Sequence, residues 1–317
     1  MSDFAFVVRE GRVTRPAVDD ALGSAGDLVW VHLLTTNAHA HAFLAERAGL
    51  SDLVVTALTA AETRPRCDKV VDGVLVNLRG LSTEQMDSSD PLASVRIYAE
   101  KGLVFSVTRK PLGATDLVRA DVEAGLIHDP GDLIARFATA ITEALDPEVA
   151  ALGDSLDECE SNLSPADIFE NRRHVAQVRV RAIGYRRFVQ PQRAAMEKLA
   201  ALPVPWLHDD DRLHLSAAAD GAARMAEELE SIRERAGVMN DALTDMRAEQ
   251  IDQRALVLSV VALVFLPLTF ITGLLGMNVE GIPDAHDPRA FWEVVALCVA
   301  IAVVIAWFFR RRRWLGR

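Results

Sequence analysis

Two long apolar runs near the C-terminus constrain this chain more than any other feature. Ala255–Val279 holds 25 residues without a charge, and Phe291–Phe309 holds 19 residues with one acid, Glu293. A helix rises about 1.5 Å per residue, so about 20 apolar residues cross the hydrocarbon core of a bilayer. The alternative, two buried helices of a soluble protein, is disfavoured by uncharged runs of this length. The sequence therefore predicts a membrane protein with two spans.

Charges beside the two runs predict the topology. The second run is followed by Arg310, Arg311, Arg312 and Arg313. Basic residues of this kind mark the cytoplasmic side of a membrane. The connector between the runs carries Glu280, Asp284 and Asp287 against one base, Arg289. We therefore expect the connector to face outward and both chain termini to be cytoplasmic.

Composition and motifs disfavour several classes of protein. The chain has 34 Lys and Arg against 45 Asp and Glu, a net charge of −11, which disfavours nucleic acid as a partner. Its three cysteines, Cys67, Cys159 and Cys298, are widely spaced and indicate a reduced environment. Met1–Glu10 does not resemble a signal peptide. No phosphate-binding loop, zinc-protease motif or nucleophile–base pair is recognisable, so no enzymatic activity is predicted.

The region before the spans divides into an α/β part and a helical part. Turn residues separate runs that predict strands at Phe4–Val8, Leu28–Leu33, Val70–Leu78, Val95–Ala99 and Leu103–Thr108. Helices are expected at His39–Gly49 and Asp52–Ala61. Beyond Pro111 the pattern is helical, with breaks expected at Pro130, Pro147, Pro165, Pro191 and Pro203–Pro205. We predict a mixed α/β cytoplasmic domain over residues 1–110 and a helical cytoplasmic region over residues 111–208.

A long stalk helix is predicted over residues 209–275, continuing into the first span. Asp209–Asp211 supply acids at its N-terminus, where capping is favoured over the binding of a regulatory cation. An apolar seam with alternating spacings of four and three comprises Met225, Leu229, Ile232, Ala236, Met239, Leu243 and Met246. Such a seam requires partner helices. The predicted class is an α+β membrane protein, completed by a loop over residues 276–290, a second span over 291–309 and a basic tail over 310–317.

The end of the first span carries the motif Gly276-Met277-Asn278, and the basic tail contains Arg313-Trp314-Leu315. Together with two C-terminal spans and an acidic loop, these features resemble the CorA superfamily of divalent-cation transporters. The strings LPLTFITGLLGMN and QPQRAAMEKLAALP and the following Gly281-Ile282-Pro283 are similar to its ZntB branch, which is associated with zinc. The resemblance implies a funnel-shaped homopentamer with one central pore in a bacterial inner membrane.

The metal and the mode of transport stay open at this level. ZntB-like members usually have glycine where this chain has Glu280, and an acid there is more like the magnesium-transporting branch. Zn²⁺ is therefore the first candidate substrate, with Mg²⁺, Co²⁺ or Ni²⁺ as alternatives. Influx or efflux, and passive conduction or proton coupling, are not distinguished. A two-span receptor is the remaining alternative, although it leaves the Gly-Met-Asn motif unexplained.

A pore can also be derived from the residues themselves. Two spans per chain cannot enclose a polar path, so several copies must surround an axis. Asn278 would then supply a ring of amide oxygens at the outer mouth, where a hydrated divalent cation can be recognised. Steps of three and four residues back along the helix give a predicted pore face comprising Asp241, Asp245, Asp252, Leu258, Ser259, Leu266, Thr269 and Gly273. Solvated acids and small-residue helix packing are the alternative interpretations of this face.

Other charged and metal-ligating residues receive simpler interpretations. Arg310–Arg313 serve as a topology anchor or, in a pentamer, as a basic collar outside the pore helices. The predicted pore face contains no His or Cys, so zinc would pass at least partly hydrated, with no resident cofactor. His39 and His41 are interpreted as surface residues, and His174, His208 and His214 show no ligand spacing. The expected partners are further copies of this chain, membrane lipid and divalent cations.

Overall fold

The computed structural model describes residues 3–34, 38–61, 64–71, 73–84, 91–164, 167–277 and 287–311 of the 317-residue chain. The chain forms two compact units. The first comprises Met1–Asn162 and Asn171–Asn240, and the second comprises Leu163–Glu170 and Asp241–Arg317. An N-terminal α/β part, one long helix and two apolar C-terminal helices are all present, which confirms the predicted fold class.

A seven-stranded mixed sheet forms the centre of the first unit. Its strand order is β2-β1-β3-β7-β6-β5-β4. β3 and β7 run parallel, and the other neighbouring strands described here are antiparallel. The strands are β1 (Phe4–Arg9), β2 (Arg12–Thr14), β3 (Leu28–Leu34), β4 (Arg66–Lys69), β5 (Val74–Leu81), β6 (Leu92–Glu100) and β7 (Leu103–Thr108). The runs at β1, β3 and β7 match three predicted strands closely, because each is rich in β-branched or aromatic residues. β6 contains the predicted strand Val95–Ala99 but begins three residues earlier, at Leu92.

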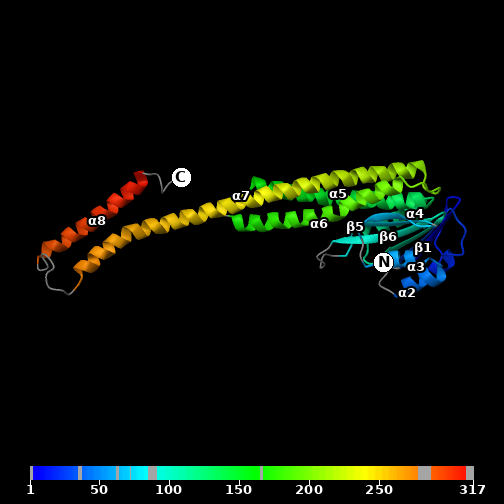
Figure 1. Ribbon diagram of the computed structural model, residues 1–317, viewed down its shortest axis with the longest axis horizontal. Helices are drawn as coiled ribbons and strands as arrows, with labels where there is room; N and C mark the ends of the chain where they lie inside the picture. The colour runs from blue at the N-terminus through cyan, green and yellow to red at the C-terminus, as the bar shows by residue number, and fades with distance from the viewer. Residues whose placement is uncertain are drawn as a thin grey trace. The chain divides into compact units, whose positions relative to one another are not determined.

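Helices cover both faces of this sheet (Figure 1). One face packs against α1 (Val18–Ala21), α2 (Ala38–Ala42), the π-helical turn η1 (Phe43–Arg47) and α3 (Asp52–Thr59). The other packs against α4 (Gly113–Glu123) and α5 (Pro130–Ser161). The Trp30 ring of β3 meets the Phe137 ring of α5 at a centroid distance of 5.8 Å. Burial on both faces explains why β3 is apolar except at His32.

The predicted strand Val70–Leu78 is wrong in its boundaries. β4 ends at Lys69 and β5 begins at Val74. The N–H of Val70 donates to the carbonyl oxygen of Gly73 at 2.9 Å. A Cβ added at Gly73 would lie 2.4 Å from the carbonyl oxygen of Ala99, so this position requires glycine.

Two of the predicted helix breaks are also wrong. Pro147 lies inside α5, and Pro191 lies inside α6 (Ile168–Ala200). Pro147 is exposed, so water can satisfy the carbonyl group that its missing N–H leaves without a partner. Pro130 occupies the first turn of α5, where proline is tolerated. Pro165 lies outside the described residues.

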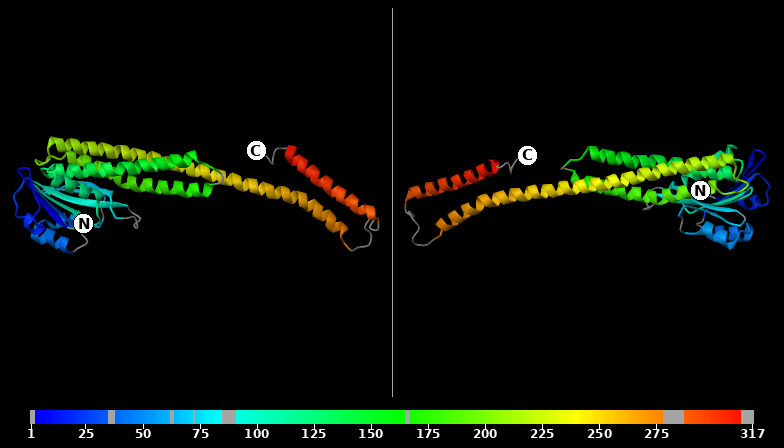
Figure 2. Two further views of the ribbon diagram at one scale, coloured as in Figure 1. Left: turned by 180° about the vertical axis from the view of Figure 1, so that it is seen from behind. Right: turned by 45° about the horizontal axis from the view of Figure 1, so that its top comes forward.

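The predicted long helix is α7, Asp209–Leu275, with 67 residues. Its first part lies beside α5 and α6 in the first unit (Figures 1 and 2). The part of the heptad seam in the first unit is buried, with Leu229 and Ala236 each 0% exposed. A Cβ at Gly221 would lie 2.8 Å from the Thr142 side chain, which shows how closely α5 and α7 approach. The partner helices that the seam requires are therefore neighbouring segments of the same chain.

The second unit contains the end of α7 and the helix α8 (Pro288–Arg311). Both helices are long and apolar enough to cross a membrane, with mean hydropathy of 2.5 and 2.4 over their most apolar 18 residues. Their apolar side chains are exposed in the single chain, for example Leu266 at 74% and Phe270 at 68%. Such a surface requires lipid or further copies of the chain to cover it.

Candidate functional site

The apolar part of the predicted pore face is exposed along α7. Leu258 is 69% exposed and Leu266 is 74% exposed. These residues are eight positions apart, about 12 Å along a helix axis. Because both side chains are exposed in the single chain, either leucine can form a ring with the same residue of other copies. The constriction predicted from the sequence requires such a ring.

The hydroxyl groups on this face are bonded within the helix. Ser259 Oγ donates to the carbonyl oxygen of Ala255, and Thr269 Oγ1 donates to that of Phe265, each at 2.8 Å. Their protons are therefore used locally, while their oxygen lone pairs remain as acceptors. Gly273 adds no side chain, and a Cβ built there would meet no atom within 4 Å. The helix between Ser259 and Gly273 therefore presents only weak oxygen ligands to a passing cation, and it obstructs the cation little.

The first two residues of the Gly-Met-Asn motif directly follow the end of α7 at Leu275. The N–H of Gly276 donates to the carbonyl oxygen of Thr272 at 2.9 Å. A Cβ at Gly276 would lie 2.9 Å from the same oxygen, so glycine is required here for close backbone approach. Met277 is 48% exposed. Asn278 lies outside the described residues, and its role at the outer mouth stays a prediction.

Three acids of the predicted face follow one another along α7 before the apolar segment. Asp241, Asp245 and Asp252 are exposed, and their spacings of four and seven place them on one side of the helix. Among the described residues, no ion pair neutralises them. An unpaired row of carboxylates keeps its negative potential and can attract cations.

The ends of α8 hold some of the remaining predicted residues. Asp287 Oδ1 accepts the N–H of Arg289 at 2.8 Å, so this acid of the predicted outer loop caps α8. The guanidinium of Arg311 lies 5.1 Å from the centre of the Trp307 ring, as a residue at the edge of a span can. Outside the described residues or side chains lie Glu280, Asp284, Arg310, Arg312 and Arg313.

The structure also joins three metal-ligating side chains that the sequence pattern did not connect. Asp129 at the start of α5 meets His208 and Asp211 at the start of α7, with ligand atoms within 4.8 Å of one another. His208 Nδ1 lies 3.0 Å from Asp129 Oδ2. Sequence spacing gave no signal for this cluster, because 79 positions separate these two residues.

Both carboxylates in this cluster cap helices. Asp129 Oδ1 accepts the N–H groups of Gly131 and Asp132 at 2.7 and 3.0 Å. Asp211 Oδ2 accepts the N–H of His208 at 2.7 Å, so the capping role favoured for Asp209–Asp211 is confirmed at Asp211. Burial, together with the charges of Asp129 and Asp132, raises the pKa of Asp211 to about 6. Helix capping accounts for this cluster.

Comparison with known proteins gives one family over nearly the whole chain. Residues 25–311 match the family described as CorA-like Mg²⁺ transporter protein. The zinc transport protein ZntB of Pectobacterium atrosepticum is 30% identical over 287 residues, covering 90% of this chain and 88% of that protein. The divalent cation transporter CmaX of Pseudomonas aeruginosa is 32% identical over 290 residues, covering 90% and 87%. The solved full-length CmaX structure superposes with a TM-score of 0.77 at 29% identity, covering 99% of this chain and 98% of that one.

Proposed function

The chain belongs to the CorA-like family of divalent-cation transporters, and we propose that its substrate is Zn²⁺, carried through the central pore of a homopentamer. One observation carries the zinc assignment: the similarity to a zinc transport protein extends over 90% of the chain. The strings on either side of the motif at residues 276–278 support the same branch.

The requirement for several copies follows from the second unit. Its two apolar helices expose their side chains and cannot enclose a polar path alone. In the proposed assembly α7 of each copy contributes the pore face, and α8 lies outside it against lipid. Exposed Leu258 or Leu266 would form the hydrophobic constriction, which gates by excluding water.

The proposed pathway treats the cation as cargo. Asn278 at the outer mouth would hydrogen-bond the water shell of the ion, while Asp241 and Asp245 attract it on the inner side. The assigned pore residues include no His or Cys, the usual zinc ligands with carboxylate, so Zn²⁺ passes at least partly hydrated. A negative interior favours inward movement by about 2.3 kcal/mol per charge per 100 mV, so passive influx is the simplest mechanism.

The proposed location is the inner membrane of a bacterium. The arginines at 310–313 keep the C-terminus cytoplasmic, and two crossings place the N-terminal unit on the same side. The chain is then divided into a cytoplasmic α/β domain, a helical region, the stalk with the first span, an outer loop, the second span and a basic tail. The tail arginines form a collar around the inner pore mouth.

Metal uptake into proteoliposomes tests this function. The full-length protein is reconstituted, and initial uptake of Zn²⁺ and Mg²⁺ is compared under imposed voltage and pH gradients, with protein-free liposomes as the control. We expect Zn²⁺ uptake that exceeds Mg²⁺ uptake. Mg²⁺ uptake that follows voltage, without Zn²⁺ uptake, would contradict the zinc assignment and give Glu280 a role in metal selection.

A further inference from the structure

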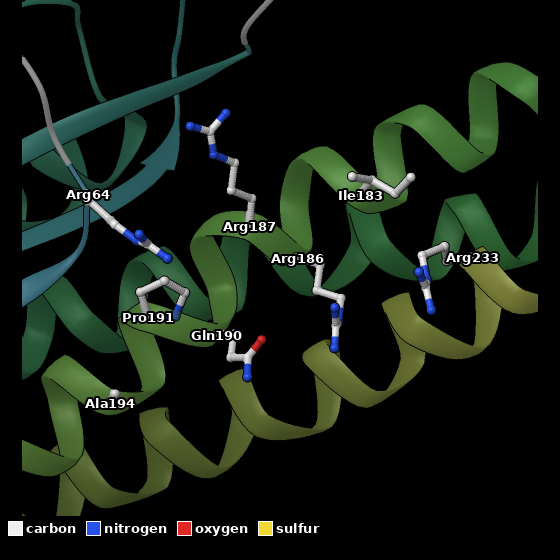
Figure 3. Close-up of a pocket in the computed structure, with 8 residues that line it drawn as sticks. All are labelled: Arg64, Ile183, Arg186, Arg187, Gln190, Pro191, Ala194 and Arg233. Carbon is white, nitrogen blue, oxygen red and sulfur yellow. The ribbon is translucent and has the colours of Figure 1, made fainter.

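An arginine-lined cavity of about 600 Å³ lies in the first unit, outside the residues assigned to the pore (Figure 3). Four arginines line it, from three separate segments: Arg64 before β4, Arg186 and Arg187 on α6, and Arg233 on α7. Figure 3 shows Arg186 projecting from α6 toward α7, while Arg64 approaches from the sheet side. The volume is in the range of about 300 to 1,000 Å³ that is typical of small-molecule sites.

Positive charge exceeds negative charge around this cavity. Arg186 Nε lies 3.0 Å from Glu230 Oε2, and the other oxygen of Glu230 pairs with Arg233. One carboxylate thus holds two of the guanidinium groups in place. Arg64 and Arg187 are exposed, and no carboxylate among the described residues pairs with either. Two cationic forks therefore remain available to an anion.

The surrounding elements strengthen this positive potential. α6 carries eight Arg and Lys residues against two acids, although the chain as a whole has a net charge of −11. Lys198 Nζ of α6 lies 3.3 Å from Asp68 Oδ1 of β4.

We propose that this cavity binds the phosphate groups of a small phosphorylated molecule, with Arg64 and Arg187 as the principal ligands. A guanidinium presents a planar fork of N–H donors that matches phosphate oxygens, and these charge-assisted bonds are stronger than neutral ones. Arg186 and Arg233, which Glu230 orients, supply further positive charge, and the amide of Gln190 adds a neutral hydrogen-bonding group. The concave shape favours a small ligand over a flat protein surface. This site is independent of which metal the protein transports.

Fluorescence anisotropy tests the site on the full-length protein in detergent, in metal-free buffer. The probe is a fluorescent analogue of adenosine triphosphate. We expect saturable binding, which Arg64→Gln combined with Arg187→Gln weakens at least about tenfold. The matched control is Arg9→Gln combined with Arg12→Gln, two exposed arginines at the ends of β1 and β2. This control removes the same charge outside the cavity and leaves binding unchanged.

Competitors distinguish the source of the phosphate. Displacement of the probe by inorganic tripolyphosphate supports recognition of phosphate itself, and displacement by a soluble short-chain phosphatidic acid extends that recognition to lipid headgroups. Displacement by adenosine alone overturns the proposal, because it locates recognition in the base. Equal weakening in both double variants also overturns it, since that result means general charge attraction. The proposal is also overturned if the Arg64 and Arg187 double variant binds the probe as tightly as the wild type. It is overturned as well if that variant binds no probe and its assembly mass differs from that of the wild type.

Discussion

At the scale of single residues, Asp211 combines helix capping with burial. It is 1% exposed and accepts the N–H of His208, and its pKa is raised from 3.8 to about 6. The folded chain therefore holds the proton of this carboxyl more tightly than the unfolded chain does. The stabilisation gained from that proton is complete below pH 3.8 and is lost as the pH rises through about 6.

Asp211→Asn should stabilise the protein at neutral pH. The amide keeps an oxygen that can accept the N–H of His208, and it removes a poorly solvated charge. We expect the free energy of unfolding at pH 8 to rise by on the order of 2 kcal/mol, with little change at pH 4. Urea unfolding across this pH range measures the difference, with the exposed Asp209→Asn as the control. A lower stability than wild type at pH 8 would show that the charge itself supports the fold.

At the scale of elements, the stalk helix depends on its seam. Leu229 is fully buried, whereas Val238, nine residues further along the same helix, is 72% exposed. Ion pairs add to the packing on this side of α7, since Arg235 bonds both Asp157 and Glu160 of α5. Exposed pairs contribute little, so the buried apolar side chains provide most of the stabilisation.

Leu229→Ala should lower the free energy of unfolding by about 2 to 5 kcal/mol, because it removes buried methyl groups and leaves a cavity. Val238→Ala on the same helix should change it by less than about 0.5 kcal/mol. Urea unfolding of the two variants side by side makes the comparison. Effects of similar size at both positions would contradict the assignment of the seam as the packed face.

The same elements show what the sequence could and could not predict. The heptad spacing predicted a long helix that packs on partner helices, and α7 is such a helix, because periodicity over many turns is a strong local signal. It did not identify α5 and α6 as the partners, since the Arg235 and Asp157 contact joins residues 78 positions apart. Pro147 was predicted to break the helix, because the sequence does not show that this turn of α5 is exposed to water. The pore face was predicted from spacing alone, and a single chain does not test it.

At the scale of the whole molecule, several copies of the chain would form rings of charge. Five copies would place ten carboxylates at Asp241 and Asp245 before the apolar part of the pore. Such rings raise the local concentration of cations, and dissolved salt screens them over about 8 Å at physiological ionic strength. Their influence should therefore depend on salt.

Asp241→Asn combined with Asp245→Asn should lower Zn²⁺ uptake several-fold at low salt and much less at high salt. Proteoliposome uptake at a series of potassium chloride concentrations measures this dependence. Asp154→Asn combined with Glu158→Gln, which changes two exposed acids on α5, should leave uptake unchanged at every salt concentration. If the Asp241 and Asp245 double variant takes up Zn²⁺ as fast as the wild type even at low salt, these acids form only a solvated face of the helix.

The Asn278→Ala variant tests the central claim most directly. Its assembly mass in detergent is measured against five copies of the 34.6-kDa chain, and its Zn²⁺ uptake is measured in proteoliposomes. Val279→Ala, at the next position, is the control. The account predicts an intact pentamer that has lost selective Zn²⁺ uptake. An intact assembly with unchanged uptake rate and unchanged preference between Zn²⁺ and Mg²⁺ would contradict it.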